Sequence, residues 1–268
     1  MSDNDRHLAG QWALILGSSS GFGAACALEL ARQGVNIFGV HLDRRSTMAQ
    51  VEALIGEIES YGVKAVFYNM NAADAEKRGA AIASMADHVE TAGDKKVKIL
   101  IHSLAFGTLK PYIGEKRPLS SRQMDMTLDV MAHSLVYWSQ EMVDGGLLGE
   151  GGRIFAMTSS GDARVIPSYG PVSAAKAALE AHIRQLAVEL APMSITANSL
   201  RAGVTDTPAL RKIPGSDRLL AGAVERNPAG RLTRPEDVAG AVVALSGPGA
   251  GFITGNVIGV DGGEDIVA

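Results

Sequence analysis

The chain has 268 residues, of which 46% are hydrophobic and 5% aromatic, and it contains 31 glycines. This length and composition suit a single α/β domain over 1–268 with many tight turns, and they exclude collagen-like and low-complexity chains. The net charge of -4 argues against a general nucleic-acid-binding protein, which needs a concentrated basic surface.

Apolar runs alternate with helical patterns in a β-α-β order along the chain. The predicted strands are 12–16, 35–40, 65–68, 97–101, 153–157, 194–200 and 256–260, and the predicted helices are 22–32, 46–61, 74–92, 121–144, 171–191 and 235–246. Segment 206–226 is predicted to be irregular to helical, because Pro208 and Pro214 interrupt it. The alternation predicts a Rossmann-type, doubly wound α/β fold: a parallel sheet of about seven strands with helices on both faces.

The chain shows no sign of a membrane segment or a metal site. No stretch reaches the roughly 18 uninterrupted apolar residues of a membrane span, and the polar N-terminus lacks the apolar run of a signal peptide. The single cysteine, Cys26, lies on the apolar side of a predicted helix, so we expect a buried thiol in a reducing compartment. The six histidines show no metal-ligand spacing. These features predict a soluble cytoplasmic protein without metal, membrane or nucleic-acid partners.

A glycine-rich turn follows the first strand and leads into a helix. Missing side chains let backbone N–H groups approach a pyrophosphate, whose charge the helix dipole favours. A turn without a ligand is the alternative, but the position within a βαβ unit favours dinucleotide binding. The cofactor-binding residues predicted here are Gly17, Ser19, Ser20, Gly21, Phe22 and Gly23.

The glycine spacing resembles that of the short-chain dehydrogenase/reductase superfamily, and further matches follow in the expected order. They are Asn71, Ser159 with Ser160, segment 202–207 and segment 256–263. The resemblance implies nicotinamide chemistry. It adds as cofactor-binding residues Asn71, Ser103, Leu104, Ala105, Lys176, Gly203, Thr205 and Thr207.

The end of the second strand bears on the choice between NADPH and NADH. In such a sheet this point meets the adenosine ribose, where an acidic side chain suits NAD and a cation suits the 2′-phosphate of NADP. Here His41 occupies the usual acidic position, and Arg44 and Arg45 follow it. We therefore expect NADPH, because arginine binds phosphate through charge-assisted hydrogen bonds. NADH is the alternative, since Asp43 would reach the ribose if the loop were displaced.

Six residues separate Tyr169 from Lys176, where most members of the superfamily have three. The usual tyrosine position is occupied by Val172. If the helix extended back to Tyr169, seven residues at 1.5 Å each would place the pair about 10 Å apart along one face. A bent entry at Gly170 would let the phenol lean toward a substrate. The plainer alternative is that Tyr169 only packs at the start of the helix.

This wider spacing resembles that of enoyl-acyl carrier protein reductases, and three further features agree. Segment 101–106 looks like the corresponding motif of those enzymes, Asp129 replaces a catalytic asparagine, and Ala202 precedes Gly203 in place of proline. Ser159 stands where the common enoyl reductases have a second tyrosine, and the glycine turn is dehydrogenase-like, a mixture most similar to the type III enzymes. The resemblance implies NADPH-dependent reduction of the trans-2 double bond of an enoyl-acyl carrier protein or enoyl-CoA thioester in fatty acid synthesis.

The same resemblance implies the roles of individual residues. Tyr169 would donate a hydrogen bond to the developing enolate, and Lys176 would bind the nicotinamide ribose. Ser159 would bind the thioester or a water, unless it only forms a turn. His102 is expected to be a packing or hydrogen-bonding residue. Segment 203–226 would be a substrate lid whose basic rim meets an acidic carrier protein, with a solvated surface helix as the alternative. A homotetramer is expected by resemblance.

Two other functions compete with enoyl reduction. One is a carbonyl reductase or alcohol dehydrogenase acting on a ketoacyl, steroid or sugar substrate, with Tyr169 as general acid and Ser159 polarising the carbonyl. The other is a catalytically silent, nucleotide-binding redox sensor. The presence of Tyr169, Lys176 and Ser159 together argues against the sensor.

Overall fold

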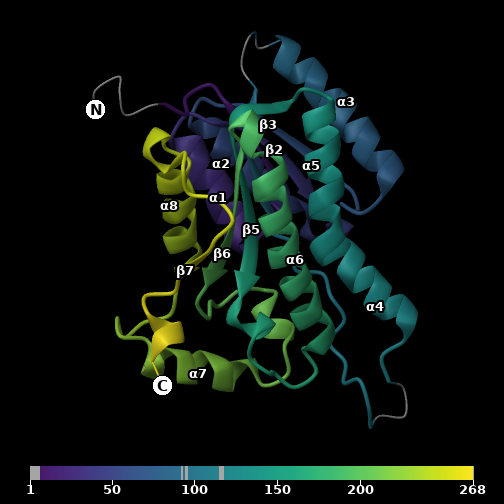
Figure 1. The fold of residues 1–268 in the computed structure, drawn as a ribbon, viewed down its shortest axis with the longest axis vertical. Helices are drawn as coiled ribbons and strands as arrows, with labels where there is room; N and C mark the ends of the chain where they lie inside the picture. Colours follow the sequence, from purple (N-terminus) through teal and green to yellow (C-terminus); the bar gives the residue numbers. More distant parts are fainter. Residues whose placement is uncertain (1–6, 92, 94–95, 115–117, 268) are drawn as a thin grey trace.

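One parallel sheet of seven strands forms the centre of the molecule (Figure 1). The computed structural model describes residues 7–91, 93, 96–114 and 118–267. The strands are β1 (Trp12–Leu16), β2 (Asn36–His41), β3 (Ala65–Asn69), β4 (Val97–His102), β5 (Leu148–Ser159), β6 (Thr196–Ala202) and β7 (Val257–Val260). Their order is β3-β2-β1-β4-β5-β6-β7, and all neighbours are parallel. The order reverses between β1 and β4, the switch point at which open α/β sheets bind ligands.

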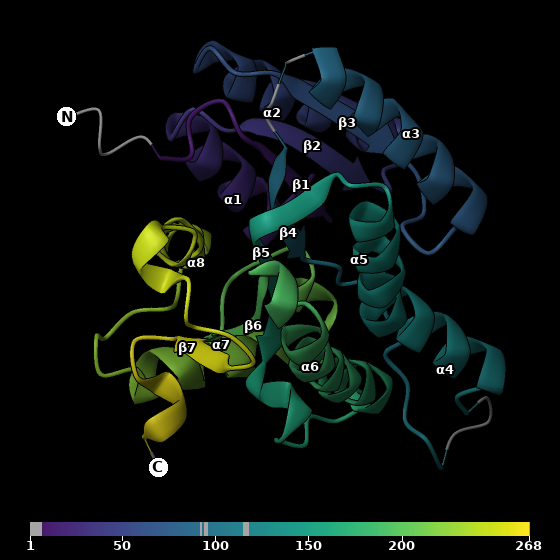
Figure 2. The ribbon, with the colours of Figure 1, turned by 45° about the horizontal axis from the view of Figure 1, so that its top comes forward.

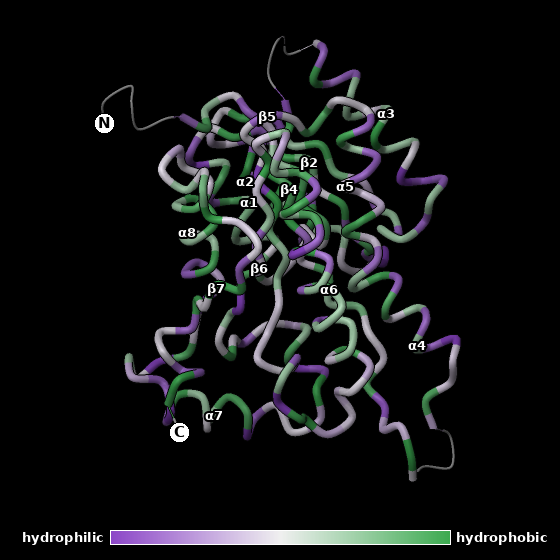
Figure 3. Tube along the Cα trace, viewed as in Figure 1, coloured by the Kyte–Doolittle hydropathy of each residue, from purple (hydrophilic) through white to green (hydrophobic). Residues whose placement is uncertain are grey.

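Helices cover both faces of the sheet (Figure 2). One face is packed by α1 (Gly21–Arg32), α2 (Met48–Ser60) and α8 (Pro235–Leu245), and the other by α3 (Ala75–Thr91), α5 (Ser134–Asp144) and α6 (Gly170–Glu189). Each face has its own apolar core, and the central strands are predominantly hydrophobic (Figure 3). The predicted Rossmann-type doubly wound fold is therefore confirmed.

The predicted helix 121–144 is divided by a π-helical turn over 129–133, which separates α4 (Ser121–Leu128) from α5. The hydroxyls of Thr127 and Ser134 each donate to the backbone carbonyl four residues earlier, at 2.7 and 2.8 Å. Such bonds compete with the regular helical ladder and bend helices. The hydrophobic period of this segment does not reveal them, which is why the sequence predicts one continuous helix.

The largest differences from the predicted strand boundaries are in β5 and β6. β5 is longer at both ends than 153–157, because it pairs with β4 from Leu148 and with β6 up to Ser159. β6 begins at Thr196 rather than at 194, since Ser194 adopts a left-handed turn with φ 58°. Segment 206–226 contains α7 (Ser216–Arg226) after a short 3-10 turn. Among the described residues, no helix combines the length and the apolar character that crossing a bilayer requires.

Candidate active site

A cavity of about 370 Å³ lies at the carboxyl ends of the strands, around the switch point. Loops that follow six of the strands contribute to its wall, so residues distant in sequence meet there. The predicted site residues that line it are Gly17, Ser19, Ser20, Gly21, Phe22, Asn71, Ser103, Leu104, Ala105, Ser159, Tyr169, Lys176, Gly203, Thr205 and Thr207. The structure thus brings most of the predicted cofactor residues and all three candidate catalytic residues to one cavity.

The glycine turn fits a pyrophosphate because its backbone is bare where side chains would intrude. A Cβ at Gly17, where φ is +89°, would collide with the Ser103 carbonyl, and one at Gly21 would lie 3.6 Å from Thr207 across the cavity. Gly23 does not itself line the cavity. A Cβ there would collide with the Gly17 carbonyl, so Gly23 allows α1 to approach the turn.

The end of β2 carries the residues expected to select between NADPH and NADH. His41 lines the cavity, whereas Arg44 and Arg45 are exposed and do not. Asp43 is held between His41 Nδ1 at 3.0 Å and the Thr47 hydroxyl at 2.8 Å. Burial alone raises the pKa of Asp43, but hydrogen bonds from Ser19, Thr47 and His41 outweigh burial and lower it. Asp43 is therefore an ionised carboxylate at neutral pH, fixed beside the glycine turn.

Tyr169 sits immediately before the first residue of α6. Its carbonyl accepts from Ser173 N at 2.9 Å, and Ser168 before it adopts a left-handed conformation with φ 63°. The bend at the helix entry is therefore at Ser168, and not at Gly170 as the sequence suggests. A serine in this region is strained, and such strain persists where surrounding structure holds it. The bend directs the phenol to the cavity.

The Tyr169 phenol is buried, with only 9% of the residue exposed. Burial raises its pKa, the Ser159 hydroxyl lowers it, and the negative charge of Asp162 raises it. The net direction is upward, so the phenol stays protonated at neutral pH and acts as a hydrogen-bond donor.

Lys176 lies deeper, on the second turn of α6, with 6% of the residue exposed. Its Nζ donates to the Met157 carbonyl at 2.6 Å and the Leu104 carbonyl at 3.5 Å, which ties α6 to the ends of β5 and β4. Burial lowers the pKa of Lys176 from 10.5 to about 8, while the charge of Glu180 opposes this shift. The Lys176 ammonium group thus places a positive charge in the wall of the cavity.

Ser159 ends β5 and forms the turn that the sequence offered as one of its two roles, while its contact with a thioester or a water stays a prediction. Its Oγ accepts from Gly161 N at 3.2 Å, which is a turn-forming contact. It also lines the cavity and lowers the pKa of Tyr169, so it is a hydroxyl neighbour of the phenol.

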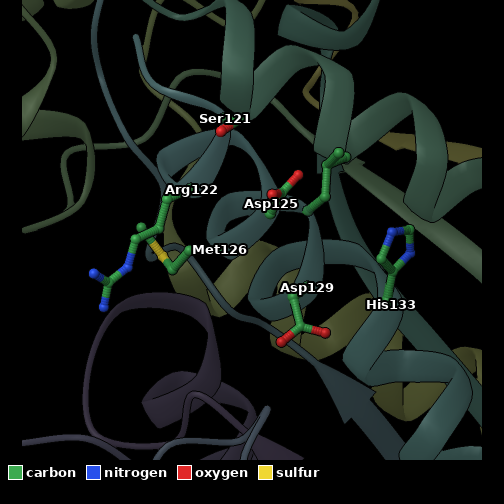
Figure 4. A pocket seen from close by; sticks show the side chains of 7 residues that line it. Ser121, Arg122, Asp125, Met126, Asp129 and His133 are labelled. Atoms are coloured by element: carbon green, nitrogen blue, oxygen red, sulfur yellow. The ribbon is translucent and has the colours of Figure 1, made fainter.

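Two other predicted positions lie apart from the chemistry. His102 is fully buried with Nε2 3.0 Å from Ser134 Oγ, and burial followed by the charge of Lys176 lowers its pKa to about 3. This neutral ring fits the predicted packing role. Asp129, on the π-helical turn, and His133 line a separate surface groove of about 550 Å³ (Figure 4). The described residues contain no group of three metal-ligating side chains.

The apolar part of the cavity was predicted only for the lid segment, which supplies Leu210, Ile213 and Leu219. Met131 of the π-helical turn, Ile166 of the loop before α6 and Val172 of α6 were not predicted to line it. The sequence motifs identify the residues at the nicotinamide end of the cavity. Single hydrophobic side chains outside these motifs form no pattern that would assign them to the cavity. Residues of segment 203–226 up to Leu219 line the cavity, and the role of the segment as a substrate lid stays a prediction.

Comparisons with known proteins agree with this geometry. A family model described as enoyl-(acyl carrier protein) reductase matches residues 17–264. A 1-cyclohexenylcarbonyl-CoA reductase from Streptomyces collinus is 30% identical over 96% of this chain and 88% of its own. An NADPH-dependent aldehyde reductase-like, chloroplastic protein from Arabidopsis thaliana is 31% identical over 96% of this chain and 94% of its own.

Among solved structures, an enoyl-[acyl-carrier-protein] reductase (NADH) from Aquifex aeolicus is similar with a TM-score of 0.82 and 25% identity, over 97% of this chain and 98% of the other. The family match begins at the glycine turn and extends past β7, and so includes every residue that lines the cavity. The chain therefore belongs to the enoyl-(acyl carrier protein) reductase family of the short-chain dehydrogenases/reductases, and it is an NAD(P)H-dependent oxidoreductase.

Proposed function

We propose that the protein reduces the trans-2 double bond of an enoyl thioester with NADPH, as a step of fatty acid synthesis in the cytoplasm. The observation that carries the proposal is the wide Tyr169–Lys176 spacing, with both side chains buried at one cavity. The Streptomyces relative supports it, because a 1-cyclohexenylcarbonyl thioester is itself a double bond conjugated with a thioester carbonyl.

The charges of the site suit conjugate reduction. The bound nicotinamide would supply hydride for the β-carbon of the substrate. Tyr169, kept protonated by burial, would donate a hydrogen bond to the thioester oxygen on which negative charge develops. Lys176 would hold the nicotinamide ribose and stabilise the same charge from a greater distance. The side chains of Ile166, Val172 and Ile213 would surround the acyl chain and exclude water.

Reduction of a carbonyl group is the second candidate. Ser159 beside the Tyr169 phenol is an arrangement that would polarise a ketone, and the Arabidopsis relative is an aldehyde reductase-like protein. The two candidates differ in the atom that receives hydride, so substrate pairs separate them.

The decisive assay follows cofactor absorbance with crotonyl thioester and, in parallel, acetoacetyl thioester, each on coenzyme A and on acyl carrier protein. Oxidation with the enoyl substrate supports the proposal, and turnover of the ketone alone would refute it. Nucleotide binding without either reaction would favour a redox sensor.

Two phenol variants locate the chemistry. Tyr169→Phe removes only the hydroxyl and should lower kcat by about 10²–10³-fold, the usual effect of losing one donor to a developing oxyanion. Cofactor affinity should stay within about twofold, because the phenol is not needed for the pyrophosphate or ribose contacts. Tyr137→Phe is the matched control, since Tyr137 packs against Arg78 and is not among the cavity residues. A loss at Tyr137 but not at Tyr169 would contradict the assignment.

The proposed preference for NADPH rests on Arg44 and Arg45, which form no ion pair within the described part of the chain. The fixed carboxylate of Asp43 is the opposing influence, because it suits a free 2′-hydroxyl. Fluorescence titration should give a lower Kd for NADPH than for NADH, and the double variant Arg44→Ala/Arg45→Ala should weaken NADPH alone. Tighter NADH binding in the wild type would assign the ribose contact to Asp43.

We also propose a homotetramer and, as the carrier of the enoyl substrate, an acyl carrier protein. Lys212 lines the cavity on the lid segment, and cations at this rim would attract an acidic carrier. Light scattering during gel filtration measures the assembly, and a monomer would contradict it. Comparison of kcat/KM for crotonyl groups on the two carriers, in the wild type and in Lys212→Met, tests the carrier.

A further inference from the structure

A cluster of charged side chains, centred on Arg201 of β6, lies next to the segments that carry the candidate catalytic residues. Arg201 Nη2 lies 3.3 Å from Asp162 Oδ2 and 3.6 Å from Glu180 Oε1, and its Nη1 lies 3.5 Å from Asp265 Oδ2. Only 25% of the arginine side chain is exposed, with 9% for Asp162 and 10% for Glu180. One guanidinium therefore contacts carboxylates from three other segments of the chain.

Two of those carboxylates belong to the segments that carry the candidate catalytic residues. Asp162 ends the short 3-10 turn that begins directly after Ser159. Glu180 lies four residues after Lys176 on α6, so the two side chains share one face of that helix. The position of each catalytic segment is thus linked to the same cation.

The sheet explains how Arg201 reaches both segments. Arg201 on β6 is the register partner of Thr158 on β5, so their side chains point to the same face of the sheet. Thr158 Oγ1 donates to Glu180 Oε1 at 2.8 Å, which binds α6 to β5 one residue before Ser159. A strand residue on a sheet face covered by helices is ordinarily apolar. Arg201 is instead charged, and carboxylates contact its guanidinium.

We infer that Arg201 is a positioning residue of the active site, which holds the turn after Ser159 and the helix of Lys176 in register around the cavity. The inference rests on the proposed roles of Tyr169, Lys176 and Ser159, but it is the same for a C=C and for a C=O substrate.

Charge balance is the physical reason. Asp162 and Glu180 are buried close together, and two like charges in such a place cannot both stay ionised without a cation. Burial raises the pKa of Glu180, and the hydrogen bond from Thr158 and the charge of Arg201 lower it, while Asp162 raises it. Without Arg201, one carboxylate must take up a proton or move, and the attached catalytic segment moves with it.

The cluster also acts on the phenol through space. Asp162 raises the pKa of Tyr169, and Glu180 raises that of Lys176. The titratable and charged groups that face the cluster or these two residues are His102 of β4, Asp162 of the turn after β5, Arg164 and Tyr169 between that turn and α6, Lys176 and Glu180 of α6, Arg201 of β6 and Asp265 of the C-terminal segment. Loss of the Arg201 charge leaves Asp162 less compensated, so the Tyr169 pKa should rise further.

The test compares Arg201→Met with Arg201→Lys. With whichever thioester the wild type reduces, Arg201→Met should lower kcat by about 10 to 100-fold, the effect of a misplacement of about 1 Å. Its Kd for the cofactor should change by less than about threefold, and Arg201→Lys should restore most of the rate. In ¹³C-labelled tyrosine spectra, assigned with Tyr169→Phe, the Tyr169 signal should titrate at higher pH in Arg201→Met. This titration is read without substrate, so it decides the inference even if the proposed reaction fails.

Arg78→Met is the matched control. Arg78 is 7% exposed in a 2.6 Å ion pair with Glu141, outside the cavity. Its loss should reduce stability without altering kcat or the Tyr169 titration. The same pattern in folded Arg201→Met, lower stability with unchanged kcat and titration, would overturn the inference. Should Arg201→Met not fold, Asp162→Asn is read instead: the Tyr169 pKa should fall, and an unchanged pKa would overturn the inference as well.

Discussion

Replacing Lys176 by Met should make the folded protein more stable at neutral pH, although it removes the side chain that would hold the cofactor ribose. Met matches the length of Lys but carries no charge, so burial no longer desolvates an ammonium group. The shift of the Lys176 pKa from 10.5 to about 8 means that, below pH 8, the protonated lysine destabilises the folded state by about 3 kcal/mol. The hydrogen bond to the Met157 carbonyl, worth about 1 kcal/mol, is lost in the variant. The expected net gain at neutral pH is about 2 kcal/mol.

The sign of this effect should depend on pH. Because the folded state binds fewer protons than the unfolded chain between about pH 8 and pH 10.5, the stability of the wild type rises with pH in that window. Above pH 10.5 both states are neutral at this side chain, the desolvation penalty is gone, and only the lost hydrogen bond remains. Lys176→Met should therefore be more stable than the wild type at neutral pH and less stable by about 1 kcal/mol above pH 10.5.

Urea unfolding at equal protomer concentration measures both free energies across this pH range. Lys64→Met, at an exposed lysine, is the control and should change stability by less than about 0.5 kcal/mol at every pH. A stability difference between Lys176→Met and the wild type that did not change between neutral pH and pH 10.5 would refute the reasoning. Cofactor fluorescence on the same samples should show that Lys176→Met no longer binds NADPH tightly.

Three further outcomes follow from single buried groups. Gly23→Ala should abolish cofactor binding, because the added Cβ would collide with the Gly17 carbonyl. Gly56→Ala, at an exposed position of α2 with open space around it, should instead stabilise the protein by about 0.5–1 kcal/mol. Fluorescence titration measures the first effect and thermal melting the second. His102 has a folded pKa of about 3 against 6.5 unfolded, so its contribution to stability is complete above pH 6.5 and lost as pH falls toward 3; the acid unfolding curve of His102→Phe should be shallower, and an unchanged slope would contradict this. Burial raises the pKa of Cys26 to about 12, so its thiol should react with Ellman's reagent only after unfolding, and rapid native labelling would show otherwise.

Local patterns were sufficient for the fold and for the geometry of the cofactor turn. Apolar runs in alternation with helical periods depend on short-range spacing, and they predicted all seven strands. The interruption at 129–133 escaped this reasoning, because it depends on where two hydroxyls place their hydrogen bonds. The sequence identifies hydroxyl groups but not the carbonyls they select.

The site was predictable as a set of residues, but its electrostatics were not. Tyr169, Lys176 and Ser159 do meet at one cavity. Asp43 is fixed by His41 and Thr47, whereas Arg44 and Arg45 are exposed and do not line the cavity.

The sequence by itself determined the doubly wound sheet and the glycine turn, since both depend on residue types at short, regular spacings, and its resemblance to enoyl reductases proposed Tyr169 as the phenol. Tertiary structure alone decided which groups are charged. The protonated Tyr169, the lowered pKa of Lys176 and the Arg201 cluster arise from burial and from contacts between β5, β6 and α6. Electrostatic energies depend on distance and desolvation, and residues far apart in the chain acquire both only when the sheet and its helices are packed.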